Sequence, residues 1–252
     1  MIIVNKGADY SALGLGRAFL PESEISNDVK TIMSNYSADD IVKQSALQIF
    51  FNSIGSTLKA KIRNMVLPIF ASNLDEAIYD IITGNPYKNV ENQTHIAFNS
   101  SKNHLYTGED VSAWPNIYYQ TNDTTNAYTG NLLLATMSPE YTCTFMGCDV
   151  SLNEGGDPAF NYNDNSKKIV GAGLVSVSGA LNLIRLGDNG AKLTPKSDAP
   201  SWWNTRTPLF GKTYHSDGNK GVRIMLVSQA LLTPEEAVTL RNAVKALDDV
   251  LY

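Results

Sequence analysis

The fold is decided by residues 37–84, SADDIVKQSALQIFFNSIGSTLKAKIRNMVLPIFASNLDEAIYDIITG. An amphipathic helix is predicted to begin at Ser37, an N-cap that is followed three residues later by Asp40. The apolar residues at helical spacing are Val42, Ala46, Ile49, Phe50 and Ile54. Gly55 is expected to end this helix. We expect the apolar stripe to pack against the rest of the chain or against a neighbouring chain, and not to bind a ligand.

A strand and a second helix follow the first helix in the same stretch. The apolar run Met65–Phe70 predicts the strand, and Pro68 places it at a sheet edge or beside a bulge. Ser72 is predicted to cap a short helix over Leu74–Ile82. Gly84 then stands where a helix C′ glycine is expected.

The composition changes after Asn85, where Asn, Thr, Ser, Gly and Tyr become frequent and the apolar period falls towards two. The candidate strands are His95–Phe98, Ile117–Gln120, Asn131–Met137, Tyr141–Val150, Ile169–Ser178, Leu181–Leu186, Lys192–Thr194 and Gly221–Ser228. Turn sequences such as Gly187-Asp188-Asn189-Gly190 separate them. Many short strands without intervening helices predict an antiparallel β-sandwich or jelly roll.

The chain closes on a helix whose start is well specified. Thr233 is predicted as its N-cap, Pro234 as its first residue, and Glu236 as the partner of Thr233 in a capping box. The expected fold is therefore mainly β, an antiparallel jelly-roll sandwich with a helical N-terminal lead-in and a closing C-terminal helix. The predicted divisions are an N-terminal arm (1–36) and a helix-led sandwich domain (37–252), with the lead-in at 37–84, the strands at 85–232 and the closing helix at 233–252.

The first 36 residues are predicted to form a docking segment. The glycine-spaced stretch from Gly7 to Gly16 is typical of an extended arm that docks on another chain or on the chain's own body. Ser26 and Asn27 are predicted to cap a short helix that reaches Asn35.

Composition excludes several classes of function. The net charge is −5 and the pI about 5.2, with no basic block, so nucleic-acid binding is not expected. The apolar run Met1–Val4 is too short for a signal-peptide core or a membrane span, so we expect neither export nor membrane insertion. Cys143 and Cys148 are expected to be buried thiols, since two cysteines make no disulfide framework.

Neither a metal centre nor a cofactor is expected. The three histidines, His95, His104 and His215, have no metal-binding spacing. The loop Asn161–Ser166 offers oxygen ligands for Ca²⁺ but lacks the acidic spacing of an EF-hand, so a solvated turn is the simpler interpretation and a Ca²⁺ site stays open.

No catalytic residues are assigned, and we expect a protein that is not an enzyme. The sequence contains neither a G-x-S-x-G elbow nor a Walker loop. Most carboxylates of the β region, such as Asp157 and Asp188, lie in turns, where Asp has a structural role. A glycoside hydrolase or lyase remains an alternative that would need two carboxylates facing each other across a groove.

Aromatic side chains are the main surface signal. Trp202 and Trp203 lie in a polar, proline-flanked loop with Arg206 nearby, and Tyr214 and Tyr118 fall near predicted strand ends. Rings of this kind can stack on sugars, which makes these residues candidate glycan ligands. Alternation along strands favours the other interpretation, in which one ring of each adjacent pair fills the core.

The order of these segments resembles a known family, the concanavalin-A-like or laminin-G-like domains of tailed-phage and prophage tail and fibre proteins. The similar segments are VLPIFA (66–71), DEAIYDI (75–81), IYYQTNDTTN (117–126), GAGLVSVSGALNLIRLGDNGAKL (171–193) and VRIMLVSQALLTPEEAVTLRNAVKALDDVL (222–251). In addition, DYSALGLG (9–16) is similar to openings of structural proteins from phages of Bacteroidetes-type hosts.

The resemblance implies a structural protein located in the virion and assembled in the host cytoplasm. Its implied partners are other virion proteins, further copies of itself and possible host-surface glycans. It implies no catalytic residues. A carbohydrate-binding module is the alternative function.

Overall fold

The structure is a computed structural model that describes residues 19–38, 40–86, 88–89, 96–107, 119–120, 132–137, 143–145, 148–150, 162–164, 167–178, 180–187, 190–195, 221–228 and 232–251. The helices are α1 (Asn27–Met33), α2 (Ile41–Lys59), α3 (Leu74–Ala77) and α4 (Pro234–Leu251), with 3₁₀ turns at Glu22–Glu24 and Pro68–Phe70. The strands of the main sheet are β1 (Ile62–Val66), β2 (Tyr79–Asp80), β3 (Asn85–Pro86), β5 (Ile96–Asn99), β6 (His104–Thr107), β8 (Leu132–Met137), β11 (Tyr162–Asp164), β12 (Lys167–Val177), β13 (Ala180–Gly187), β14 (Gly190–Pro195) and β15 (Val222–Ser228). Two separate strand pairs are β4 (Lys88–Asn89) with β7 (Tyr119–Gln120), and β9 (Cys143–Phe145) with β10 (Cys148–Val150).

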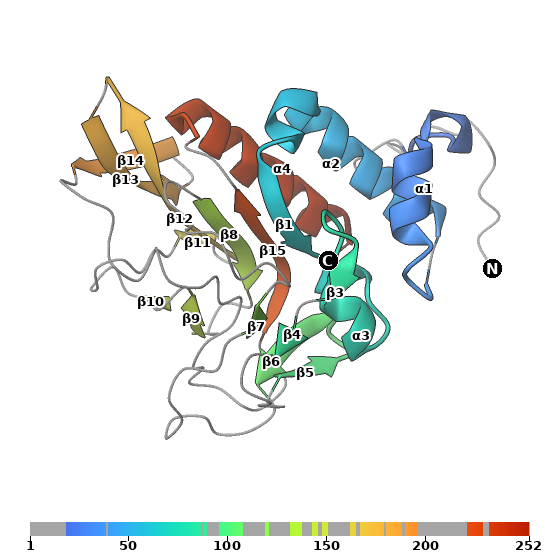
Figure 1. The fold of residues 1–252 in the computed structure, drawn as a ribbon. Coiled ribbons are helices and arrows are strands. Elements are labelled where there is room, and N and C mark those ends of the chain that lie inside the picture. The colour runs from blue at the N-terminus through green and yellow to red at the C-terminus, as the bar shows by residue number, and fades with distance from the viewer. Residues whose placement is uncertain are drawn as a thin grey trace.

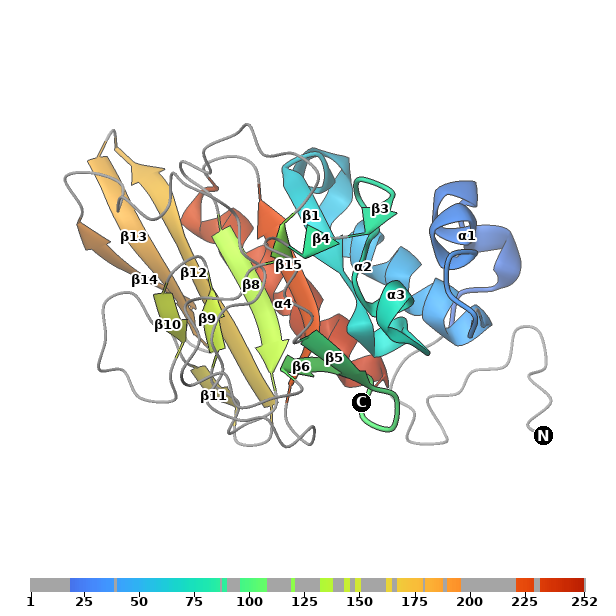
Figure 2. The same ribbon diagram turned by 60° about the horizontal axis from the view of Figure 1, so that its bottom comes forward.

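An open antiparallel sheet is the centre of the molecule, with its main strands in the order β14-β13-β12-β8-β15-β1 (Figures 1 and 2). Strands β2 and β3 extend it beyond β1. The prediction of an antiparallel, sheet-rich fold with flanking helices is therefore confirmed at this level.

Strand β15 occupies an inner position in the sheet, between β1 and β8. Met225 is paired with Val66 of β1 and with Ala135 of β8. The run VRIMLVS is almost continuously apolar, and every residue in it is buried. A strand covered on both faces needs such a run, which explains why this segment lies inside the sheet and not at its edge.

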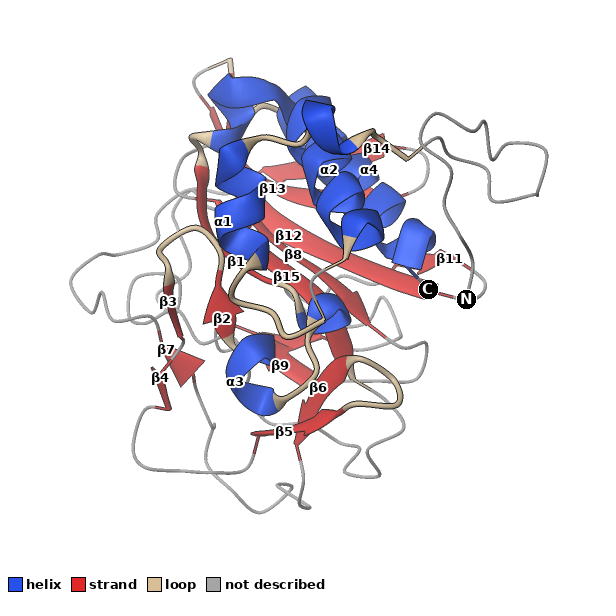
Figure 3. Cartoon of the chain, turned by 90° about the vertical axis from the view of Figure 1, so that its right-hand side faces the viewer, coloured by secondary structure: helices blue, strands red, loops and turns tan. Residues whose placement is uncertain are grey.

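The long helices cover one face of this sheet. Figure 3 shows α2 and α4 on one side of it, with α1 beside α2. Helix α4 crosses the sheet and contacts β8, β12, β13, β14 and β15. The core lies between the two layers and contains Leu47 and Phe50 of α2, Met225 of β15 and Leu240 of α4.

Two helix starts agree with the sequence prediction. The Ser26 hydroxyl accepts a hydrogen bond from the Val29 amide at 3.3 Å at the start of α1. At α4, the Thr233 hydroxyl accepts from the Glu236 amide at 3.2 Å, and the Glu236 carboxylate accepts from the Thr233 amide at 2.9 Å. This reciprocal pair is the predicted capping box.

The predicted start and end of α2 were wrong by a few residues. Its N-cap is Asp40, whose carboxylate accepts from the Lys43 amide at 2.8 Å, whereas Ser37 donates to the Glu76 carboxylate from both its amide and its hydroxyl. Gly55 has φ +70° and ψ 170°, which kinks the chain, but a further helical turn follows it as far as Lys59. Gly55 therefore bends the helix instead of ending it.

The segment after α2 also differs from the prediction. Strand β1 ends at Val66, and Pro68 begins the 3₁₀ turn, so the proline lies outside the strand. The second helix is only α3, capped by Asn73 and not by Ser72. Residues 79–80 pair with β1 and β3 instead of continuing the helix, and Gly84, at φ +71°, closes a turn on Asp80.

The predicted strands after Asn85 overlap strands of the structure. One exception in detail is Tyr141–Val150, which forms the hairpin β9–β10 instead of a single strand. Four strands of this region were missed: β3, β4, β6 and β11. Strand β11 lies inside the predicted loop Asn161–Ser166 and pairs with β12.

Candidate protein-docking groove

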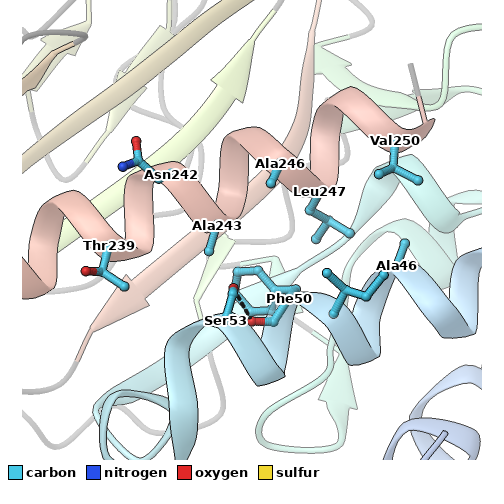
Figure 4. Close-up of a pocket in the computed structure, with 10 residues that line it drawn as sticks. Ala46, Phe50, Ser53, Thr239, Asn242, Ala243, Ala246, Leu247 and Val250 are labelled. Carbon is cyan, nitrogen blue, oxygen red and sulfur yellow. Dashed lines mark hydrogen bonds between the residues drawn. The ribbon is translucent and has the colours of Figure 1, made fainter. Parts of the chain in front are cut away.

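Helices α2 and α4 lie side by side and leave a groove of about 300 Å³ between them (Figure 4). Helix α2 contributes Ala46, Ile49, Phe50 and Ser53 to its lining. The α4 wall runs from Thr239 to Val250. We name this feature the α2–α4 groove.

The groove exists because small side chains stand where the two helices face each other. Ala46 of α2, with Ala243 and Ala246 of α4, lines the groove without filling it. Its floor is formed by Phe50 and Leu247, each only 2% exposed. The groove is therefore a shallow apolar trough on top of a well-packed core.

The polar groups of the groove lie at its rim. Ser53, Thr239 and Asn242 are exposed there. The Ser53 hydroxyl donates to the Phe50 carbonyl at 2.7 Å, so it is engaged within its own helix (Figure 4). The lining contains no charged side chain. An apolar floor with an uncharged polar rim suits the apolar side chains of a protein segment.

A second, more open depression lies where α1, α2 and β1 meet, with a volume of about 700 Å³. It contains charged groups: Lys59 pairs with Asp28 at 3.8 Å and lies 4.2 Å from the centre of the Phe51 ring. These contacts already use the charged groups inside the molecule, so the α2–α4 groove is the better docking candidate.

Asp80 is a buried carboxylate whose two oxygens are both engaged in hydrogen bonds. One oxygen accepts from the Met65 and Ile82 amides, both at 3.0 Å, and the other accepts from Asn64 at 2.6 Å and Thr83 at 2.9 Å. Burial raises the pKa of Asp80, although the four hydrogen bonds act in the opposite direction. Its oxygens are committed to holding the turn after β2 against β1, which is a structural role.

Glu76 organises the neighbouring loops in a similar way. Its carboxylate accepts from Ser37, from the Ser72 amide at 2.8 Å and from Asn73 at 2.7 Å. Burial acts to raise the pKa of Glu76, but these hydrogen bonds outweigh it and leave the pKa below its ordinary value. This side chain therefore ties the start of α3 to the segment that precedes α2.

The buried Tyr36 lies close to these carboxylates. Burial, and then the neighbouring Tyr79, Asp80 and Glu76, raises its pKa. Its hydroxyl has no hydrogen-bond partner within the described residues. The Tyr36 ring makes edge contacts with Phe70 and Tyr79, at centroid distances of 5.9 and 6.1 Å, so it serves as a packing residue.

A buried ion pair positions α4, and with it one wall of the groove. Arg223 of β15 donates to Asp248 of α4 through two parallel hydrogen bonds, of 2.7 and 2.9 Å. Both side chains are almost completely buried, at 2% and 1% exposure. A two-bond contact of this kind fixes both the position and the rotation of the helix on the sheet.

The glycan candidates from the sequence all lie outside the described residues: Trp202, Trp203, Arg206, Tyr214 and Tyr118. His95 and His215 also lie outside them, whereas His104 is buried in β6. The described residues contain no group of three or more His, Cys, Asp or Glu side chains that could hold a metal ion. Of the possible Ca²⁺ loop, the structure describes the backbone of β11.

The α2–α4 groove was missed by sequence reasoning. The available signal was a pair of alanines, Ala243 and Ala246, three residues apart and therefore on one face of α4. Within the described part of the chain, no helix has both the length and the apolar character that crossing a membrane requires. Comparisons with protein-family models, curated proteins and solved structures found no match for this chain.

Proposed function

We propose that this chain is a non-enzymatic structural protein of a tailed-phage or prophage virion, which assembles with other proteins through the α2–α4 groove. The observation that carries the assembly role is the groove itself, an uncharged apolar trough on an otherwise tightly packed helical layer. The virion assignment is supported by the ordered segments that resemble tail and fibre proteins, among them residues 171–193 and 222–251.

The finer fold assignment is part of the same proposal. A concanavalin-A-like jelly roll needs a second sheet facing the first. The described residues contain one main open sheet with helices on one face. A sandwich would therefore have to place its second sheet on the opposite face.

The proposal is tested in particles. Mass spectrometry and antibody labelling of purified virions from the host strain should find this protein at a fixed copy number per particle, on the tail, fibre or head surface. Particles that lack the protein, together with a purified chain that binds none of the particle's other proteins, would rule it out.

Glycan attachment is a second candidate, and it rests on the adjacent tryptophans Trp202 and Trp203. Calorimetry with host-surface polysaccharide should detect binding that Trp202→Ala and Trp203→Ala each weaken at least tenfold. The third tryptophan of the chain provides the control, since Trp114→Ala should leave the affinity unchanged. Equal affinity in all three variants would remove the tryptophan pair from the glycan site.

A further inference from the structure

We propose that the α2–α4 groove receives the apolar segment Met1–Val4 of a second copy of this chain. This inference rests on the proposed function, because it names the partner for the assembly groove. It is carried by three observations: where the first 18 residues join the described structure, how far they reach, and which side chains the groove can accept.

The junction lies beside α2. The Leu20 amide donates to the Ser45 hydroxyl at 2.7 Å, and the Ser26 amide donates to the Gln48 side chain at 2.9 Å. Ser45 and Gln48 stand on the flank of α2 that faces α1, whereas Ala46 and Phe50 face α4. Neighbouring positions on a helix differ by about 100°, so the chain enters α2 on a different flank from its own groove.

The segment has enough reach to contact a neighbouring molecule. Residues 5–18 can span up to about 46 Å when extended, at about 3.3 Å per residue. The 19-residue helix α2 is only about 28 Å long. The segment is therefore long enough to leave its own molecule and enter the groove of the next one.

The chemistry of the segment matches that of the groove. The segment Met1–Val4 has only apolar, uncharged side chains, and the polar Asn5 and Lys6 follow it. The groove has an apolar floor and an uncharged rim, and its volume of about 300 Å³ is of the order that roughly two aliphatic side chains would fill. Ile2 and Ile3 are suited to that place, with Asn5 and Lys6 left at the exposed rim.

The resulting contact has a definite symmetry. One surface, the segment, meets a different surface, the groove, so the interface is heterologous. Interfaces of this kind build rings when the rotation between copies closes and open chains when it does not. Both are arrangements that a repeated structural protein can use.

The test compares variants of the full chain by analytical ultracentrifugation over a range of concentrations. The unchanged chain should associate, and the double variant Ile2→Asp/Ile3→Asp should associate at least tenfold more weakly. Asn5→Asp adds a charge beside the run without removing an apolar side chain, and should associate normally.

In the groove, Ala246→Glu should weaken association to a similar extent, whereas Thr57→Glu, at an exposed α2 position outside the groove, should not. Circular dichroism melts check that every variant folds.

Mixing the two defective variants provides the decisive measurement. The Ile2→Asp/Ile3→Asp chain keeps an intact groove, and the Ala246→Glu chain keeps an intact segment. A one-to-one mixture should therefore form dimers that grow no further, although each variant alone is monomeric. If the unchanged chain is monomeric at every concentration, or if the mixture stays monomeric, the proposal is wrong.

The outcomes also separate this inference from the proposed function. If Ala246→Glu blocks assembly with particle proteins but Ile2→Asp/Ile3→Asp does not, the groove is a docking site for another protein, and the segment proposal fails alone. If neither variant changes assembly, the docking role of the groove fails as well.

Discussion

Asp80 shows how one side chain can hold several backbone segments in place. It is only 1% exposed, and its two oxygens serve four donors from β1 and from the turn after β2. Two of those donors are backbone amides, those of Met65 in β1 and Ile82 in the turn after β2. The carboxylate thus substitutes for regular secondary structure at the point where the chain leaves the sheet.

Replacing Asp80 should discriminate between loss of charge and loss of hydrogen bonds. Asp80→Ala should lower the free energy of unfolding by about 3 kcal/mol or more, since it leaves buried donors unsatisfied. Asp80→Asn should cost about 1 kcal/mol, because its oxygen keeps the two amide bonds and a rotated Asn64 amide can accept from the new NH₂ group. Urea denaturation measures both, and equal losses would show that the hydrogen bonds are not what matters.

Glu76 should make the free energy of unfolding depend on pH in the acid range. Its pKa in the folded chain lies below its ordinary value of 4.5, because hydrogen bonds to the charged form outweigh burial. Its contribution is therefore present above about pH 4.5 and is lost as the pH falls through the folded pKa. Melting temperatures measured from pH 7 to pH 3 should fall less steeply on the acid side for Glu76→Gln than for the unchanged chain.

Asp80 should change the pH dependence of stability in the opposite direction to Glu76, because its pKa is raised on folding. Its contribution is present below the ordinary pKa of 3.8 and is lost as the pH rises through the folded pKa. Asp80→Asn should therefore steepen the acid-side fall that Glu76→Gln reduces. An unchanged pH profile in both variants would contradict these assignments.

At the scale of elements, the packing of α4 on β15 depends on the buried ion pair Arg223–Asp248. Removing one partner, as in Arg223→Met or Asp248→Leu, should cost about 3–5 kcal/mol, because the other charge stays buried without its partner. The double variant should recover most of that loss, since a well-packed apolar pair carries no desolvation cost. The exposed pair Lys245–Asp249 supplies the control, where Lys245→Ala should cost no more than about 0.5 kcal/mol. Chemical denaturation of the four variants measures the cycle, and additive losses would contradict it.

The helix boundaries show which features of an element are set by residues nearby in the sequence and which depend on distant residues. The starts of α1 and α4 follow from residues within one turn, Ser26 and the Thr233–Glu236 box, and both were predicted. The start of α2 depends on a partner 39 residues away, because Glu76 takes the hydrogen bonds of Ser37 and leaves the cap to Asp40. Two potential caps lie within four residues, and sequence alone does not say which one a distant carboxylate will bind.

At the scale of the whole molecule, the centre of the sheet should be its most stable part. All residues of β15 are buried, and β15 joins β1 from the lead-in to β8 from the middle of the chain. Native-state hydrogen exchange should find the slowest amides in β1, β8, β15 and α4, and faster exchange in β2, β3 and α1, which have fewer neighbours to lose on local opening. Protection that is highest in α1 would contradict this order.

Local signals in the sequence were enough to predict the type and place of most elements. Alternating and continuous apolar runs predicted the strands, helical spacing predicted α2 and α4, and capping residues predicted the start of α4, because these signals act over a few residues. The sequence also predicted an antiparallel sheet, since strands linked by short turns without helices pair in that way.

The order of the strands in the sheet and the location of the groove depend on contacts between distant segments. Strand β1 pairs with β15, the last strand of the chain, and not with the next long strand in sequence. Strand β15 is buried along its whole length, and its backbone groups on both edges are paired with neighbouring strands, β1 on one side and β8 on the other. The groove arises because alanines from α2 and α4, almost two hundred residues apart, are brought face to face. The pattern within each segment is set by its own residues, whereas the choice of neighbours depends on burial that distant segments share.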